Sequence, residues 1–348
     1  MEVYPAYAHR SGDGWTIPLI YRVHEERSWL SRVVSRVVES MADLQPVEVE
    51  RFRDRIHHFV TDSESRESVT FAVVGDPSGE TYRLEGPEGE PVRTDLHGFA
   101  EGTLTLPADR VEAVRAAGHA DGGWLTVSVS SQEHTGTGRV HLVEPEGLSI
   151  ISDIDDTVKR TGIPGGPRTV VRKTFFEEWE ALPDMAEHFA RWGVEANDGL
   201  AVHFVSAGPW QLQPHLEDFL SSPETGFPEA SFHMRPVRKH PLSLVTWRNL
   251  YRLIVADDDT YQYKVEATTE IVERFPDREF ILVGDTGQDD PEAYRTVRER
   301  FPDRIREIVI RDVTDARSRN PDRLEGLTVV PAEDLREGSR SSPDGGSR

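Results

Sequence analysis

Three aspartates and a threonine follow directly after a short apolar run near the middle of the chain. The segment reads Leu148-Ser-Ile-Ile-Ser-Asp153-Ile-Asp155-Asp156-Thr157, in which an uncharged strand ends in the acids. Open α/β sheets bind ligands just past the carboxyl ends of their strands, so these carboxylates are placed to do chemistry. Carboxylates this close repel one another unless a cation or a proton lies among them. For this segment alone, an acidic surface turn is the alternative.

A second apolar run ends in the same way, much later in the chain. The strand expected at 279–283 is followed by Gly284, Asp285, Asp289 and Asp290. In a parallel sheet, strand ends from distant positions in the sequence meet at one edge. The two acidic strand ends are therefore expected to face each other, which disfavours the surface-turn interpretation of the first.

Carboxylates that meet at a sheet edge predict a magnesium site, because Mg²⁺ prefers oxygen ligands and keeps some of its water. A zinc or copper site is disfavoured, since the chain has no cysteine and its histidines lack local ligand spacing. His57 and His58, for example, have no ligand at i±4 and are interpreted as surface or packing residues. The predicted metal ligands are Asp153, Asp155, Asp285 and Asp290, with Asp289 as a neighbouring alternative.

Magnesium attracts phosphate, so the same residues predict phosphoryl transfer. One aspartate can be the nucleophile, and an aspartate two residues on can act as the acid and base. Ser206 follows an apolar strand and Lys264 opens a helix, and both could donate to a phosphoryl group. The alternatives are a helix N-cap for Ser206 and a solvated helix position for Lys264, with Lys239 as its rival. Trp210 is interpreted as a packing residue.

Strands and helices alternate after Ser149, which predicts a Rossmann-like parallel sheet with helices on both faces. A loop rich in Gly, Pro and basic residues is expected from Lys159 to Lys173, beside the proposed anion site. Strands are expected at 148–152, 200–205, 231–235, 279–283 and 305–310, and helices at 175–192, 212–220, 247–255, 264–275 and 291–301.

The first part of the chain has a different pattern. Apolar residues at helical spacing predict helices at 30–41 and 49–60. Short strands between Gly/Pro turns, at 69–74, 81–84, 102–106, 124–130 and 138–143, predict a small antiparallel β-sandwich that could be a binding module or a support. An extended segment is expected at 15–23. The expected division is an extended and helical segment 1–65, a strand-rich domain 66–146, a catalytic domain 147–335 and a disordered tail 336–348.

Composition restricts the partners. The 348 residues have a formal net charge of −22, a field that repels nucleic acid and anionic lipid head groups. The absence of cysteine excludes disulfides and thiolate catalysis. No signal peptide and no apolar run of about 18 residues is found, so a cytoplasmic protein with at most peripheral membrane contact is expected.

The acidic motif resembles the first motif, Asp-x-Asp-x-Thr, of the haloacid dehalogenase superfamily of phosphatases. Ser206 fits the second motif of that superfamily, Lys264 the third, and Gly284-Asp285 with Asp289 or Asp290 the fourth, in family order. This resemblance implies the fold that the strand and helix pattern predicts, HAD-like, and it implies Mg²⁺ as cofactor.

From Ser149 to Val313 the chain more closely resembles the actin-patch-protein type of phosphatidate phosphatase catalytic domain, and the strand-rich region resembles what precedes this domain in bacterial members. The motifs that carry it are Ser-Asp-Ile-Asp-Asp-Thr, Ser-Ala-Gly-Pro-Trp and Gly-Asp-Thr-Gly-Gln-Asp-Asp-Pro-Glu. Thr286 and Ala207 depart from the usual family residues. The resemblance implies that Asp153 is the nucleophile and a metal ligand, that Asp155 is the general acid and base, and that Thr157 shapes the phosphate-binding loop. It also implies that Ser206 and Lys264 bind the phosphoryl oxygens and that Asp285 and Asp290 bind magnesium.

The resulting hypothesis is a Mg²⁺-dependent phosphatase that hydrolyses a phosphomonoester, with a phosphatidate-like lipid as the substrate that the resemblance implies. A non-catalytic protein that binds a lipid or phosphorylated ligand on the same fold is one alternative. A phosphatase of soluble metabolites is the other, and the short stretch between Ser206 and Lys264 leaves little room for a large capping domain.

Overall fold

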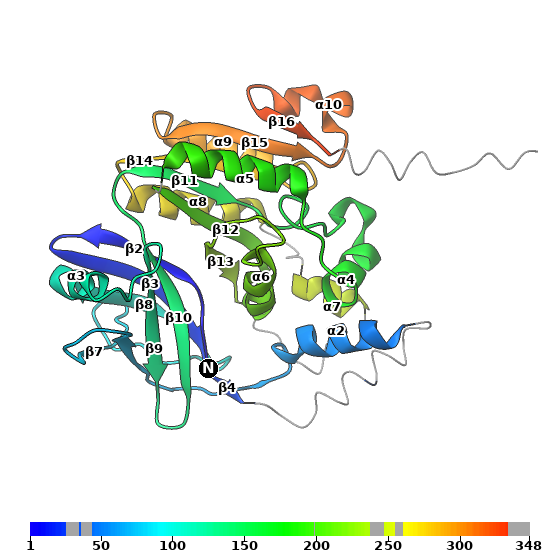
Figure 1. Cartoon of the computed structure of the whole chain (residues 1–348). Coiled ribbons are helices and arrows are strands. Elements are labelled where there is room, and N and C mark those ends of the chain that lie inside the picture. Colours follow the sequence, from blue (N-terminus) through cyan, green and yellow to red (C-terminus); the bar gives the residue numbers. More distant parts are fainter. Residues whose placement is uncertain (26–34, 36–43, 198, 237–246, 255–259, 333–348) are drawn as a thin grey trace, which may run out of the picture.

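The structure is a computed structural model of the whole chain, and it describes residues 1–25, 35, 44–197, 199–236, 247–254 and 260–332. The protein is mixed α/β, with one large mixed sheet and one parallel sheet that carries helices (Figure 1). Three sequence predictions lie outside the described residues: the tail 336–348, Lys239, and the helix 30–41 apart from residue 35.

The parallel sheet has six strands in the order β13-β12-β11-β14-β15-β16, and every neighbouring pair is parallel. The strand β11, which the acidic motif follows, lies between β12 and β14, with Ser152 in register with Phe204 and Val283. The carboxyl ends of these three strands therefore end at one edge, as predicted. The strand bounds are β11 Gly147–Ser152, β12 Leu200–Pro209, β13 Ser231–Arg235, β14 Arg278–Asp285, β15 Ile305–Asp312 and the unpredicted β16 Thr328–Pro331.

Helices cover both faces of this sheet. Ile150 packs into a hydrophobic cluster with residues of α4 to α7, whereas Ile151 packs into a second cluster with residues of α8 and α9. Successive residues of a strand point to opposite faces, so an apolar strand of this kind must be covered twice. The helices are α4 Pro167–Phe175, α5 Pro183–Ala196, α6 Gln213–Leu220, α7 Trp247–Ile254, α8 Thr260–Arg274, α9 Asp290–Arg300 and the short α10 Ala316–Arg319.

The single helix predicted at 175–192 is wrong. The chain leaves the helical conformation after α4 and re-enters it at Pro183, a residue that suits the first position of a helix. The apolar residues between the two helices, Phe176, Trp179 and Leu182, are buried and therefore mimic helical periodicity. The predicted basic loop is also wrong in its second half, because residues 167–173 belong to the helix α4.

The strand-rich part is one eight-stranded sheet that draws on both segments expected before residue 147. Strand β3 pairs with β1, β2 and β8, and β2 also pairs with β10. The pairing of β2 with β10 is parallel, so the sheet is mixed and the predicted antiparallel sandwich is wrong. Such long-range pairing leaves no local mark in the sequence. The bounds are β1 Glu2–Val3, β2 Ala6–Ser11, β3 Gly14–Arg22, β6 Thr70–Val73, β7 Thr81–Tyr82, β8 Phe99–Pro107, β9 Trp124–Ser130 and β10 Thr135–Leu142, with α3 at Ala108–Ala116.

The helix α2 (Pro46–His57) connects the two sheets. Its Phe52 stacks on Phe176 at 4.8 Å between ring centroids, and its Arg55 donates hydrogen bonds to the carbonyl of Thr174. Nearby, the short strands β4 (His24–Glu25) and β5 (Asp62–Ser63) pair with each other. Among the described helices, none combines the length and the apolar character needed to cross a membrane.

Candidate active site

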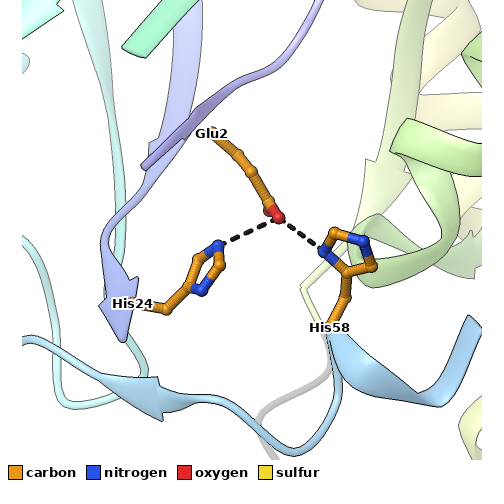
Figure 2. Close-up of side chains that lie close together, drawn as sticks. All are labelled: Glu2, His24 and His58. Atoms are coloured by element: carbon orange, nitrogen blue, oxygen red, sulfur yellow. Dashed lines mark hydrogen bonds and ion pairs between the residues drawn. The ribbon is translucent and has the colours of Figure 1, made fainter. Parts of the chain in front are cut away.

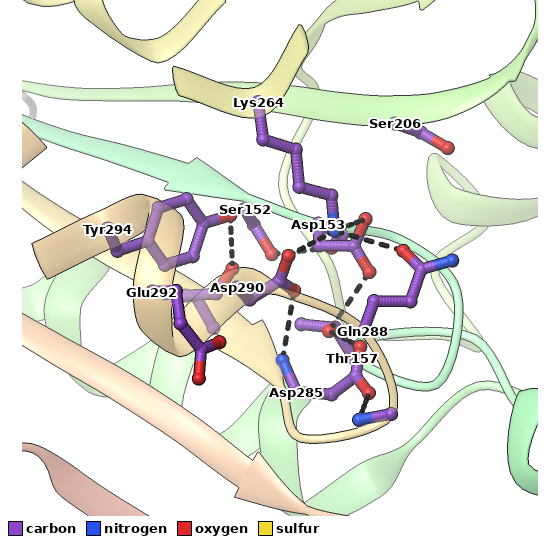
Figure 3. Close-up of polar contacts among 12 residues, drawn as sticks. Ser152, Asp153, Thr157, Ser206, Lys264, Asp285, Gln288, Asp290, Glu292 and Tyr294 are labelled. Carbon is purple, nitrogen blue, oxygen red and sulfur yellow. Dashed lines mark hydrogen bonds and ion pairs between the residues drawn. The ribbon is translucent and has the colours of Figure 1, made fainter. Parts of the chain in front are cut away.

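Three buried aspartates meet where β11 and β14 end and α9 begins (Figure 3). Asp153 follows β11, Asp285 is the last residue of β14, and Asp290 is the first residue of α9. One carboxylate oxygen from each lies within 4.8 Å of the others. The prediction that acids from distant strand ends gather at one edge is therefore confirmed.

Lys264 is the cation that contacts this cluster. It projects from α8, is fully buried, and lies with its Nζ 2.9 Å from Asp153 and in contact with Asp290. Lys264 also donates to the amide oxygen of Gln288 at 3.3 Å. The hydroxyl of Thr157 lies 3.3 Å from Asp153 and 3.4 Å from Asp285. Three carboxylates thus face one ammonium.

Burial shapes the ionisation of the cluster. It raises the pKa of Asp153 to about 7, with the neighbouring Asp290 adding to the rise and Lys264 opposing it. The pKa of Asp285 lies well above its usual value because of burial and then because of Asp290 and Asp153. For Lys264, burial alone would lower the pKa, but Asp153 and Asp290 outweigh it and hold the pKa well above its usual value.

The donor set suits a hard divalent cation. All three groups in the cluster are carboxylates, and they outnumber the ammonium of Lys264, the one cation that the described residues bring into contact with them. Burial and the repulsion between the carboxylates both raise these pKa values, and a magnesium ion would offset both effects. Asp153, Asp285 and Asp290 are the residues that could hold it.

Asp155 points elsewhere. Its carboxylate lies 2.8 Å from the ammonium of Lys159 and accepts a hydrogen bond of 2.5 Å from the hydroxyl of Thr161. Burial would raise its pKa, but Lys159 and Thr161 outweigh this effect and lower the pKa. The structure therefore separates Asp155 from the three clustered carboxylates, although all four were predicted as metal ligands.

The loop after Asp155 is closed by the next aspartate. Asp156 has a left-handed backbone conformation with φ of 61°, and its carboxylate accepts hydrogen bonds of 2.6–2.8 Å from the backbone N–H groups of Thr161, Gly162 and Ile163. This closure brings Thr161 back to Asp155. Sequence reasoning missed these supporting roles, although the spacing of Asp155 and Lys159 is a recognisable i, i+4 pair.

Ser206 lies in β12, where its hydroxyl accepts a hydrogen bond of 3.0 Å from the backbone N–H of Gly208. It does not cap a helix. A small cavity is lined by Asp153, Asp155 and Ser206, among other residues, so the expected donor faces the same space as both catalytic candidates.

Two further sequence predictions concern neighbouring residues. Asp290 lies in the carboxylate cluster, whereas Asp289 is exposed. Trp210 is buried and stacks on Tyr4 at 4.5 Å between ring centroids, which confirms it as a packing residue.

These acids, the lysine and their order along the chain can be compared with known proteins. Residues 148–312 match the family model of the phosphatidate phosphatase APP1 catalytic domain. The match coincides with the range, Ser149 to Val313, over which the sequence motifs indicated that family.

Two curated relatives agree with this match. An uncharacterised protein of Schizosaccharomyces pombe is 32% identical over 50% of this chain, and phosphatidate phosphatase APP1 of Saccharomyces cerevisiae is 30% identical over 53%. The matching parts span 26% and 29% of those proteins. The crystal structure of a carbohydrate acetylesterase from Xanthomonas citri aligns with 72% of this chain and 54% of the esterase chain, at 12% identity. Its TM-score of 0.23 is too low to indicate a shared fold.

Proposed function

We propose that this protein is a magnesium-dependent phosphatase that hydrolyses a phosphomonoester through an aspartyl-phosphate on Asp153, with a HAD-like catalytic domain. The observation that carries the proposal is the buried cluster of Asp153, Asp285 and Asp290 around Lys264. A binding protein would have no need for several carboxylates at the place where an anionic phosphate must enter.

In the proposed first step, a carboxylate oxygen of Asp153 attacks phosphorus, an O–P bond forms and the ester P–O bond breaks. Asp155, which lines the same cavity, gives a proton to the leaving alkoxide. In the second step, Asp155 takes a proton from water, the water oxygen bonds to phosphorus, and phosphate leaves with Asp153 regenerated.

The lowered pKa of Asp155 favours the ionised form, which is the form that activates water. To act first as an acid, its carboxylate must leave Lys159 and gain a proton as substrate binds. Lys264 contacts Asp153 and would orient it, and Ser206 lines a cavity with Asp153. In the proposed mechanism both Lys264 and Ser206 would donate to phosphoryl oxygens. Magnesium held by Asp153, Asp285 and Asp290 would supply charge neutralisation for the phosphate.

The proposed substrate is a phosphatidate-like lipid. The support is the match of residues 148–312 to a phosphatidate phosphatase catalytic domain and the similarity to the yeast phosphatase. A comparison of a lipid ester with a soluble ester distinguishes this proposal from a phosphatase of soluble metabolites.

The test measures phosphate release with Mg²⁺ from phosphatidate in detergent micelles and from glycerol 3-phosphate. We expect faster release from the lipid, and a loss of about 10³-fold or more in Asp153→Asn, because the amide is a poor nucleophile. Asp303→Asn, which changes an exposed aspartate, is the matched control. Undiminished release from Asp153→Asn would reject the mechanism, and preference for the soluble ester would reject the lipid substrate.

A further inference from the structure

A second group of possible metal ligands lies far from the aspartate cluster in sequence and in chemistry. Figure 2 shows Glu2 between His24 and His58. One carboxylate oxygen of Glu2, Oε1, lies 3.0 Å from Nε2 of His24 and 2.6 Å from Nδ1 of His58. The three donor atoms lie within 4.8 Å of one another.

Three separate segments contribute these residues. Glu2 belongs to β1, His24 to β4, and His58 caps the carboxyl end of α2. The histidines are 22 and 56 residues from Glu2 along the chain, so no local ligand spacing exists. This is why inspection of i±4 positions could not find the group.

The surroundings hold Glu2 and the backbone of His58 in place. The hydroxyl of Tyr4 donates to the other oxygen of Glu2, Oε2, at 3.0 Å. Arg22 donates to the carbonyl of His58 at 2.5 Å and to the hydroxyl of Thr61 at 3.0 Å, which holds the end of α2 in place. Outer contacts of this kind typically orient metal ligands.

The group is shielded without being sealed. The exposed fractions of the side chains are 15% for Glu2, 11% for His24 and 18% for His58. In the part of the chain that the structure describes, Nδ1 of His24 is buried and has no hydrogen-bond partner. Because all three side chains are partly exposed, an ion could reach the donors from solvent, and water could complete its coordination.

We propose that Glu2, His24 and His58 form a zinc-type site that fastens the N-terminal strand to α2. Two imidazole nitrogens and one carboxylate oxygen are the ligands that zinc commonly takes when no cysteine is present. The ion would replace the protons that now join the imidazoles to the carboxylate. This site differs in donors and position from the all-carboxylate cluster at Asp153.

Its role would be structural. The ion would connect the eight-stranded sheet, through β1, and the two-stranded β4–β5 sheet, through β4, to the end of the helix α2. That helix contacts the catalytic part through Arg55, which donates to the carbonyls of Thr174 and Glu177 at 2.8 and 2.7 Å. Zinc should therefore stabilise the full chain and leave the phosphate chemistry unchanged in kind.

The test uses the full chain without a histidine tag, stripped of metal with a chelator and kept in excess Mg²⁺ to occupy the aspartate cluster. Zinc binding is measured by calorimetry and by metal analysis after dialysis, and thermal unfolding is followed with and without Zn²⁺. Wild type is expected to bind one ion and to melt at a higher temperature with it. The affinity should fall by at least about tenfold in Glu2→Gln, His24→Gln and His58→Gln.

Two controls keep the result interpretable. His119→Gln, at an exposed histidine, and Asp153→Asn should both bind zinc as wild type does. Glu2→Gln is the most conservative ligand change, so it remains informative if a histidine variant does not fold. X-ray absorption of the bound zinc should report nitrogen ligands at about 2.0–2.1 Å.

The proposal is overturned if wild type binds no zinc, if Glu2→Gln and the histidine variants bind it equally well, or if the absorption spectrum shows oxygen ligands alone. In those cases the three residues are a hydrogen-bonded group and nothing more. None of these results bears on the phosphatase mechanism, which the Asp153→Asn assay tests independently.

Discussion

The surroundings of Asp153 and Asp155, two residues apart, shift the pKa values of these aspartates in opposite directions. Asp153 is buried among other carboxylates, and its pKa rises to about 7. Asp155 is partly buried, but its contact with Lys159 outweighs burial and lowers its pKa. For the proposed mechanism, Asp153 must lose its proton to act as the nucleophile, and Asp155 must gain one before it can act as the acid.

Replacing Lys159 should therefore change the pH profile of the reaction. In Lys159→Met the group that lowers the pKa of Asp155 is lost while burial remains, so the pKa of Asp155 must rise. In the proposed first step Asp155 must be protonated, so we expect the basic limb of kcat/KM, where Asp155 loses that proton, to move to higher pH. Lys173→Met, which removes an ion pair with Glu177 on α4, should leave the limb in place. An unshifted limb in Lys159→Met would mean that Asp155 does not set it.

At the scale of elements, the end of β14 and the start of α9 approach so closely that β14 requires a glycine at Gly284. A Cβ added to Gly284 would lie 2.4 Å from a carboxylate oxygen of Asp290 and 2.6 Å from its Cβ. The backbone N–H of Asp285 donates to this same carboxylate at 3.1 Å. The glycine thus lets the start of α9 place Asp290 beside the end of β14.

Gly284→Ala should consequently impair catalysis more than folding. Displacement of Asp290 by even about 1 Å is expected to reduce phosphate release by about 10–100-fold. The matched control is Gly193→Ala in α5, where the new Cβ would meet only Leu200 at 3.8 Å. That change should retain activity and stabilise the helix by up to about 1 kcal/mol. Full activity in Gly284→Ala would show that Asp290 is not needed at its observed place.

The opposite end of the parallel sheet is held by one buried arginine. Arg278 starts β14 and donates to the carbonyls of Glu144, Glu146, Leu148 and Gly199 and to the hydroxyl of Ser149, at 2.5–2.8 Å. It therefore joins the entry to β11 with the strands on either side of it, β12 and β14.

Arg278→Met should destabilise the fold, because several buried carbonyls would lose their donors together. We expect the free energy of unfolding to fall by about 3 kcal/mol or more, measured by urea denaturation. Arg300→Met, which loses a single 3.3 Å contact with Thr269 at the surface, should change it by less than about 0.5 kcal/mol. Equal stability of both variants would show that the contacts of Arg278 contribute little.

At the scale of the whole molecule, the net charge of −22 makes the basic segment from Lys159 to Lys173 conspicuous. Much of its charge is used inside the protein. Lys159 contacts Asp155, Arg160 contacts Glu180, and Arg172 contacts Glu48 and Glu177. The segment therefore supports the active-site loop and the docking of α2, and it presents less free positive charge to a lipid surface than its composition indicates.

The acidic cluster should also link stability to pH and to magnesium. The folded pKa of Asp153 is raised to about 7, above the unfolded value, so without metal the free energy of unfolding falls as pH rises through this window, from about 4 to about 7. In the proposed mechanism Mg²⁺ would bind the ionised cluster. Its addition should therefore raise Tm more at about pH 8 than at about pH 6.

In Asp285→Asn the cluster loses a carboxylate, so the metal-dependent rise in Tm should largely disappear. Asp303→Asn should keep it, since that residue is exposed and distant along the chain. An equal effect of Mg²⁺ on wild type and Asp285→Asn, followed by calorimetry, would contradict a magnesium site at these aspartates.

The sequence alone predicted the strands that end at the site and the order of the motif residues along the chain. Apolar runs that end in acids identified β11 and β14, and their parallel pairing implied that the acids meet. These features are local, because a strand's periodicity and the residues just after it lie within a few positions of one another.

Only the tertiary structure decided which side chains of that set touch. It turned Asp155 to Lys159, placed Asp290 and not Asp289 against Asp285, joined the N-terminal strands to β8 and β10, and brought two distant histidines to Glu2. Side-chain direction depends on competing neighbours contributed by distant segments. Those neighbours become known only once the sheets have paired and the helices have packed on them.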